Sequence, residues 1–172
     1  RISVSRYSDK FTLKGGIFLY ALFGGCYSRA TSDLDLAVQE IDNDLPCLAE
    51  VFKEIFMVES DDALLYDLSS LEIRRITEFK TSPGATISIR AYLDRTIIPV
   101  SIDIGFGDFI YPCRQQIEFP VLLKMEVPLI YVYSIYSVIA EKFEAIVSLG
   151  YANTRFKDFY DISVLAANFD LN

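Results

Sequence analysis

The sequence contains neither histidine nor tryptophan among its 172 residues. Without histidine the chain cannot build a Ser-His-Asp triad, a Cys-His pair or a zinc site with imidazole ligands. Any chemistry must therefore use carboxylates, lysine, arginine, hydroxyl groups or thiols.

Cysteine is scarce. Cys26, Cys47 and Cys113 are far apart and form no Cys-x-x-Cys pair. Their odd number and wide spacing argue against a disulfide framework or a cysteine zinc site, and they fit a reducing compartment. The longest apolar runs, 17–23 and 128–133, are too short to cross a bilayer. The first residues do not resemble a secretory signal, so we expect a cytoplasmic protein without membrane contact.

Positive charge is also in short supply. The chain has 24 acidic and 16 basic residues, for a formal charge of −8. This balance argues against a protein that coats nucleic acid through a broad basic face, but it leaves room for a local basic strip. Hydrophobic residues make up 52% of the chain, which predicts a folded core and not a disordered segment.

The pattern of apolar residues predicts an α+β fold. Period-two and helical spacings indicate a helix at 17–23, a strand at 32–38, a helix at 44–56, strands at 68–79, 85–93 and 99–106, and helices at 134–148 and 154–168. This order favours a mixed, mostly antiparallel sheet with flanking helices and closing helices packed to one side. We expect a core over 1–126 and a C-terminal helical segment over 127–172, within one compact unit.

The strongest local signal is a pair of acids on a predicted strand. Residues two apart on a strand point the same way, so Asp33 and Asp35 share a face while Leu34 turns inward. A lone Asp-x-Asp is usually a solvated strand. Here Asp103, between Ile102 and Ile104 on another predicted strand, is poorly explained as random surface. If the strands are neighbours, the three carboxylates form one cluster suited to Mg²⁺.

The second signal is Lys14-Gly15-Gly16, between a short apolar run and a helix. Glycines let the backbone approach a ligand closely, and a helix start offers free N–H groups to a phosphate. Two glycines in a tight turn are the simpler interpretation of the motif alone. Gly24-Gly25 lies closer to Asp33 and is a rival for the phosphate turn.

Four further groups have more than one interpretation from the residues themselves. Lys142 lies among glutamates on a predicted helix, where a surface ion pair is the simpler interpretation. Asp158 and Asp161 share a helix face and could position Lys142 or Arg155, or form an exposed acidic face. Five basic residues lie on or beside the two middle strands: Arg74, Arg75, Lys80, Arg90 and Arg95. They could form a basic strip that binds nucleic acid, or they could simply protect a sheet edge through their charge. Packing in the core is the simpler role for Tyr131, Tyr133 and Tyr136.

Three segments together resemble the AbiEii/AbiGii abortive-infection toxin family of nucleotidyltransferases. The first runs from LKGG to Arg29-Ala30-Thr31-Ser32-Asp33-Leu34-Asp35-Leu36. The second is VSIDIGFGDFIYP, which carries Asp103 and a Gly-Phe-Gly-Asp continuation. The third is the Ala-Glu-Lys helix followed by RFKDFYDI near the C-terminus. The match spans nearly the whole chain in the same order.

The resemblance implies a DNA-polymerase-β-type nucleotidyltransferase core. It makes Gly15 and Gly16, with Lys14, the turn that binds the triphosphate, and it favours this turn over Gly24-Gly25. It also implies the remaining roles: metal ligands Asp33, Asp35 and Asp103; nucleotide contacts Thr31 and Lys142; and catalytic residues Asp33, Asp35, Asp103, Lys142 and Asp158. The expected cofactor is Mg²⁺ or Mn²⁺, with a nucleoside triphosphate as substrate.

The function implied is transfer of a nucleoside monophosphate to a hydroxyl of RNA, for example a tRNA end, or of a protein. Asp103 would assist removal of the acceptor proton. Such an enzyme would be the toxin of a bacterial toxin–antitoxin or phage-defence pair, with a cognate antitoxin as partner. An alternative is a catalytically silent module of the same fold that binds a protein partner. An unrelated acidic-site hydrolase would fit only if Asp103 lay far from the acidic pair.

Overall fold

The computed structural model describes residues 1–27, 29–76 and 84–171, which form two compact units. The first unit holds residues 1–108 and 116–132, and the second holds 109–115 and 133–172. The strands are β1 Phe11–Lys14, β2 Leu34–Val38, β3 Leu64–Ile76, β4 Gly84–Leu93, β5 Thr96–Phe106, β6 Gln115–Glu118 and β7 Leu129–Val132. The helices are α1 Gly15–Leu22, α2 Leu45–Met57, α3 Ile135–Leu149 and α4 Phe156–Asn168, with 3₁₀ turns at Ile2–Val4 and Gly150–Ala152.

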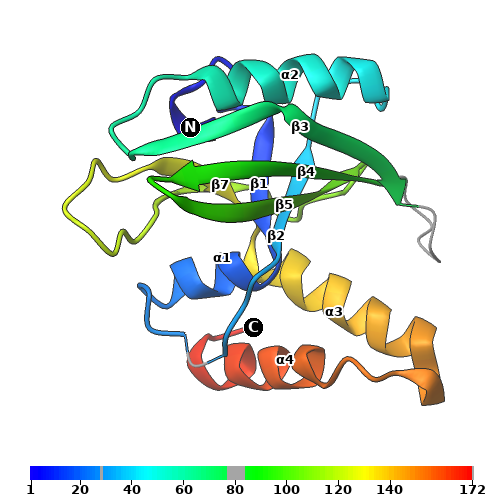
Figure 1. Cartoon of the computed structure of the whole chain (residues 1–172). Helices are drawn as coiled ribbons and strands as arrows, with labels where there is room; N and C mark the ends of the chain where they lie inside the picture. The colour runs from blue at the N-terminus through cyan, green and yellow to red at the C-terminus, as the bar shows by residue number, and fades with distance from the viewer. Residues whose placement is uncertain (28, 77–83, 172) are drawn as a thin grey trace. The chain divides into compact units, whose positions relative to one another are not determined.

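One seven-stranded sheet organises the first unit, in the order β3-β4-β5-β2-β1-β7-β6 (Figure 1). The pairs β1–β2, β3–β4 and β4–β5 are antiparallel, whereas β2–β5 and β1–β7 are parallel. The predicted α+β class with a mixed, mostly antiparallel sheet is confirmed. Strand β6 has no counterpart in the sequence prediction, because its alternation covers only four residues.

The two faces of this sheet differ in chemistry. Alternate residues of β4 and β5, such as Ile87, Ile89, Ile102 and Ile104, are buried on one face. Helix α2 lies on that side, where Phe52 meets Phe11 edge-on with ring centroids 5.5 Å apart. Helix α1 continues directly from the end of β1. The opposite face of the sheet carries the polar half of each alternating strand.

Helix α2 begins as the sequence predicts. The Asp44 side chain accepts a hydrogen bond from the backbone N–H of Cys47 at 3.2 Å, and Pro46 stands in the first turn. An N-cap carboxylate satisfies an N–H that has no partner inside the helix, and proline costs nothing at that position.

Several expected boundaries shift. Strand β3 begins at Leu64, four residues earlier than predicted, and residues 77–79 of its expected end lie outside the described residues. Strand β2 begins at Leu34, so Asp33 precedes it. Lys80 of the expected basic strip is also outside the described residues. In the described part of the chain, no helix has the length and hydropathy needed to span a membrane. All three cysteines are free.

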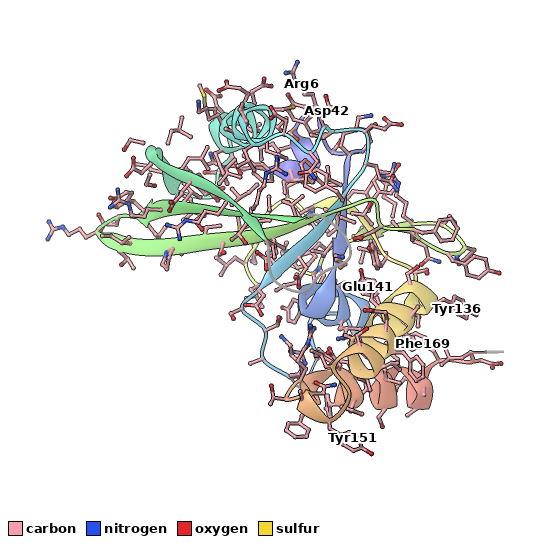
Figure 2. The ribbon with its side chains drawn as sticks, turned by 90° about the vertical axis from the view of Figure 1, so that its right-hand side faces the viewer. Arg6, Asp42, Tyr136, Glu141, Tyr151 and Phe169 are labelled. Carbon is pink, nitrogen blue, oxygen red and sulfur yellow. The ribbon has the colours of Figure 1, made fainter. Side chains whose placement is uncertain are left out.

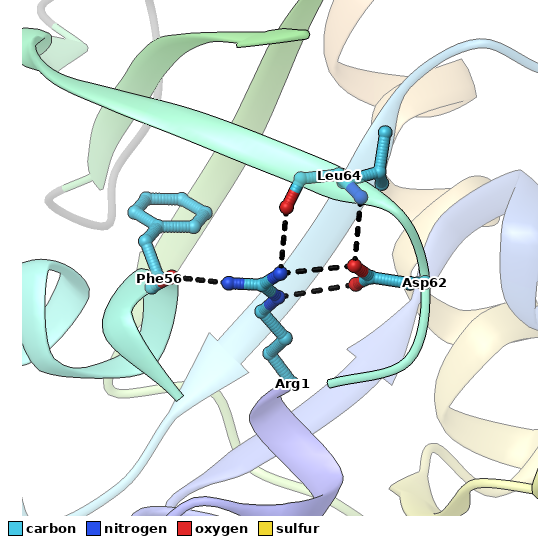
Figure 3. A network of polar contacts seen from close by, with 4 residues as sticks. All are labelled: Arg1, Phe56, Asp62 and Leu64. Atoms are coloured by element: carbon cyan, nitrogen blue, oxygen red, sulfur yellow. Dashed lines mark hydrogen bonds and ion pairs between the residues drawn. The ribbon is translucent and has the colours of Figure 1, made fainter. Parts of the chain in front are cut away.

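A partly buried ion pair fastens the first residues to α2 and β3 (Figure 3). The Arg1 guanidinium donates hydrogen bonds to both oxygens of Asp62, at 3.1 and 2.9 Å, and to the carbonyl oxygens of Phe56 and Leu64. Its plane also lies over the Tyr66 ring, 4.7 Å from the centroid. The hydrogen bonds from Arg1 hold the pKa of the Asp62 carboxyl below its usual range.

This network predicts a pH-dependent stability. Because the pKa of Asp62 is lowered in the folded state, its stabilisation is present above the unfolded pKa of about 3.9 and disappears as pH falls through the folded pKa. Asp62→Asn should lower the free energy of unfolding by about 2 kcal/mol at neutral pH. Urea unfolding at several pH values should show the difference shrinking in acid. The exposed Asp42→Asn is the control, and a loss that stays constant with pH would refute this assignment.

Candidate active site

A row of charged and polar residues crosses the sheet on the face opposite the buried isoleucines. In the strand register Lys14 of β1 stands opposite Asp35 of β2, and Asp35 stands opposite Asp103 of β5. Asp103 stands opposite Thr86 of β4, which stands opposite Arg74 of β3. Residues paired in this way project from the same face of a sheet. The structure therefore brings Asp35 and Asp103 side by side from segments 68 positions apart.

The Asp103 carboxylate is held in place by its own sheet. The Thr86 hydroxyl donates a hydrogen bond to one Asp103 oxygen at 2.7 Å. The neighbours Ile102 and Ile104 are buried on the opposite face, as the alternation predicts. Asp103 is thus fixed at a polar surface whose reverse side is core.

Gly15 is required where the backbone meets the Asp35 carboxylate. A Cβ built on Gly15 would lie 2.0 Å from Oδ2 of Asp35, and the φ of Gly15 is +67°. Any side chain at this position would both collide with the acid and adopt a strained backbone. The acid of β2 consequently packs directly on the first residue of α1.

The next residue, Gly16, lies against the segment that precedes the acidic pair. A Cβ on Gly16 would lie 2.5 Å from the Thr31 hydroxyl oxygen and 2.9 Å from an Arg29 guanidinium nitrogen. The Lys-Gly-Gly turn, Thr31 and Asp35 therefore meet at the start of α1. Arg29 belongs to the same corner, although only its place in the segment before Asp33 pointed to it in the sequence.

The rival glycine pair occupies the other end of this helix. Gly24 and Gly25, both with positive φ, follow the last residue of α1, Leu22. Backbone carbonyls and partial negative charge face outward at a helix C-terminus, whereas N–H groups and partial positive charge face outward at its N-terminus. Only Gly15-Gly16 stands at the end that favours an anion.

Lys14 pairs with an acid that sequence reasoning did not assign to the site. Its ammonium lies 2.6 Å from Oδ2 of Asp108, and both side chains are largely buried. The pair lies over Gly105, where a Cβ would be 2.9 Å from the Asp108 oxygen and 3.2 Å from the Lys14 nitrogen. The Gly-Phe-Gly-Asp continuation after Asp103 was the available signal, since it supplies both Gly105 and Asp108.

The predicted cluster of three acids is present only in part. Asp33 lies just before β2, and the Ser32 hydroxyl donates to it at 3.1 Å. Among residues 1–27, 29–76 and 84–171, no three His, Cys, Asp or Glu side chains are arranged to hold a metal ion. The register thus pairs two carboxylates, Asp35 and Asp103. The third predicted ligand, Asp33, directly precedes the first residue of β2.

Only part of the expected basic strip lies on the sheet face that carries Asp103. Arg74 continues the row of Asp103 and pairs with Glu72 at 2.7 Å. Arg90, on the same face of β4, pairs with Asp67 at 2.9 Å. Arg75 instead donates weakly to Asn43 near the start of α2. Arginines do accompany the acids along the ribbon of β3, β4 and β5, with acidic neighbours that offset part of their charge.

The second unit has its own charged centre between α3 and α4. The ammonium of Lys142 lies 2.9 Å from Asp158 and 2.6 Å from Asp161, and both acids are fully buried. Arg155 forms an ion pair with the second oxygen of Asp158 at 2.8 Å. The surface ion pair considered for Lys142, and the exposed acidic face considered for Asp158 and Asp161, are therefore both wrong.

This charged centre also changes the packing of α4. The helical spacing of Phe156, Phe159 and Tyr160 would favour an apolar inner face, yet these side chains are exposed, while Asp158 and Asp161 are buried. The two acids are buried because they share the cation of Lys142. Tyr136, expected in the core, projects from α3 (Figure 2).

The fold matches that of two solved structures from Helicobacter pylori. The chain superposes on JHP933 from Helicobacter pylori with a TM-score of 0.57 and 18% identity, over 98% of this chain and 61% of that one. It superposes equally well on a structure described as a candidate nucleotidyltransferase from H. pylori, of which it covers 63%. The chain thus spans less than two thirds of each of these proteins. No curated protein sequence matches it.

The family follows from the sequence as a whole. The model of the AbiEii family, described as nucleotidyl transferase AbiEii toxin of type IV toxin–antitoxin systems, matches residues 1–172. The chain belongs to this family. The resemblance seen in the three sequence segments is thereby confirmed.

The centre in the second unit predicts a strong stability effect. Lys142→Met would leave two buried carboxylates without their shared cation, which should lower the free energy of unfolding by about 3–5 kcal/mol. The same change at Lys53, which makes an exposed pair with Glu50, should cost less than about 1 kcal/mol. Urea unfolding followed by circular dichroism measures both. Equal losses would mean that the buried centre does not stabilise α3 against α4.

Proposed function

We propose that the protein transfers a nucleoside monophosphate from a nucleoside triphosphate to an acceptor hydroxyl. Membership of a nucleotidyl transferase family makes this the first activity to test. The observation that supports it most is the register of β2 and β5, which sets Asp35 beside Asp103 on a polar sheet face.

Asp35 and Asp103 fit a divalent cation. Two carboxylates on adjacent strands repel each other, and a hard cation with oxygen ligands relieves that repulsion. Asp33, one residue before β2, is the proposed third ligand. Mg²⁺ or Mn²⁺ held there would neutralise phosphate charge and lower the pKa of the acceptor hydroxyl.

The start of α1 suits the triphosphate. The N–H groups of Gly15 and Gly16 stand at a helix N-terminus, where an anion is favoured, and Arg29 and Thr31 lie against Gly16. Lys14, opposite Asp35 in the register, brings an ammonium to this corner, and its ion pair with Asp108 offsets part of that charge. Lys142 and Asp158 enter the proposal on the family resemblance alone.

The reaction then needs one proton transfer. The acceptor oxygen attacks the α-phosphorus, the bond to the β-phosphate oxygen breaks, and pyrophosphate leaves. Thr86 holds one oxygen of Asp103, so the carboxylate is oriented to take the acceptor proton through the other. Thr86 thereby acts as a positioning residue for this base.

The acceptor we propose is a hydroxyl of RNA, a tRNA end among the options, or of a protein. Arg74 and Arg90 lie on the same sheet face as Asp103 and would contact an RNA backbone. In this proposal the protein is the toxin of a type IV pair and is restrained by a cognate antitoxin. The competing proposal is a silent member of the family that only binds a partner. An unrelated acidic-site hydrolase would require Asp103 to lie far from the acidic pair. Asp103 lies beside Asp35, so this alternative is dropped.

Removal of either central acid should abolish transfer. With radiolabelled triphosphates, Mg²⁺ and total RNA, Asp35→Asn and Asp103→Asn should each reduce label transfer by at least about a hundredfold, since an essential ligand is lost. Chelation of the metal should do the same to the unaltered protein. Asp42→Asn, at an exposed position before α2, should keep its activity. Undiminished labelling by Asp35→Asn would contradict the metal assignment.

Binding separates the enzyme from the silent module. An enzyme should gain thermal stability from a triphosphate in the presence of Mg²⁺, and Asp103→Asn should lose most of that gain. Thermal unfolding with each of the four triphosphates measures this. No shift with any of them, together with tight binding of the antitoxin, would favour the silent module.

A further inference from the structure

A pocket of about 730 Å³ runs along α1 in the first unit. Ile17 and Tyr20 of α1 line one wall, and Tyr27, Arg29 and Thr31 of the segment before β2 line another. Its third wall is the apolar connection between β6 and β7, residues 119–128. No role has been assigned above to Tyr20, Tyr27 or this connection.

One end of the pocket is suited to negative charge. Thr31 and Arg29 line it there and also lie against Gly16, at the N-terminus of α1. This is the corner proposed for the triphosphate. Arg29 and Thr31 therefore belong both to the pocket and to the proposed phosphate subsite, and they connect the two.

The rest of the pocket is apolar and aromatic. The Tyr27 ring stacks on Phe23 with centroids 5.2 Å apart, and the Arg29 guanidinium lies over the same ring, 5.9 Å from its centroid. These contacts fix the orientation of the ring. The Tyr20 ring meets Phe119 at 6.1 Å, and its hydroxyl would be 3.1 Å from a Cβ on Gly25. Leu122, in the covering connection, is otherwise exposed. Rigid aromatic and apolar walls are what a nucleobase prefers to contact.

We propose that this pocket holds the base of the nucleoside triphosphate. The inference rests on the proposed function, and it adds the subsite that would read the base. A nucleotide is anionic at one end and aromatic at the other, and the pocket likewise joins the corner of Arg29 and Thr31 to aromatic and apolar walls. The volume lies within the range of about 300–1,000 Å³ typical of small-molecule sites. Apolar contacts dominate the lining, so discrimination among the four bases should be modest.

The test compares ligands with and without a base. Binding of each nucleoside triphosphate and of inorganic tripolyphosphate is measured by calorimetry in Mg²⁺. Ala30→Trp is the main variant, because Ala30 lines the pocket yet is exposed, so a large side chain can fill the space without disturbing the core. Ala167→Trp, at an exposed position of α4, is the matched control. Tyr27→Ala and Tyr27→Phe form a second pair.

Ala30→Trp and Tyr27→Ala should each weaken triphosphate binding about tenfold, since stacking of one base contributes about 1–3 kcal/mol. Ala30→Trp should leave tripolyphosphate binding unchanged, and Tyr27→Phe and Ala167→Trp should match the unaltered protein. If the unaltered protein binds triphosphates and the two variants do so equally well, the base lies elsewhere. If they bind triphosphates normally but label RNA poorly, the pocket holds an acceptor base instead, and the inference is wrong. If the unaltered protein binds no triphosphate, the proposed function itself fails.

Discussion

The parallel pairing of β2 with β5 is the constraint on which the candidate site depends. It sets Asp35 directly beside Asp103, and the antiparallel strands on either side extend the row to Lys14 and Thr86. A shift of one residue in this register would turn one acid toward the core. The register is protected because Ile102 and Ile104 are buried on the reverse face, so a slip would expose them and bury charge. The same register of β2 and β5 is thus required both to pack the core and to place the two acids side by side.

Close backbone approach is the second feature that shapes the site. Asp35 rests on Gly15, and the pair of Lys14 with Asp108 rests on Gly105. In both places a charged group occupies the volume of a missing side chain. Because these glycines have no Cβ, the strands and the start of α1 can approach each other closely. It also makes Asp108 part of the same arrangement as the acids that the sequence pattern singled out.

The sequence predicted most elements because each has a clear period or a clear cap. The alternation of Ile87, Ile89 and Ala91 located β4, and Asp44 with Pro46 located the start of α2. It could not predict which strands are neighbours, since the β2–β5 register joins segments that are distant along the chain. It also misjudged α4, because aromatic residues at helical spacing normally mark the buried face. There the burial of Lys142 with Asp158 and Asp161 overrides hydropathy, and no local pattern reveals that an acid has a buried partner on another helix.

The direct test of the central claim is to locate a cation. A crystal of the protein grown with Mn²⁺ and a non-hydrolysable triphosphate would reveal the ion through its anomalous scattering. The account predicts a peak within coordinating distance of carboxylate oxygens from both Asp35 and Asp103, with the phosphates at the start of α1. An ion bound away from these two acids while the nucleotide is present would contradict it.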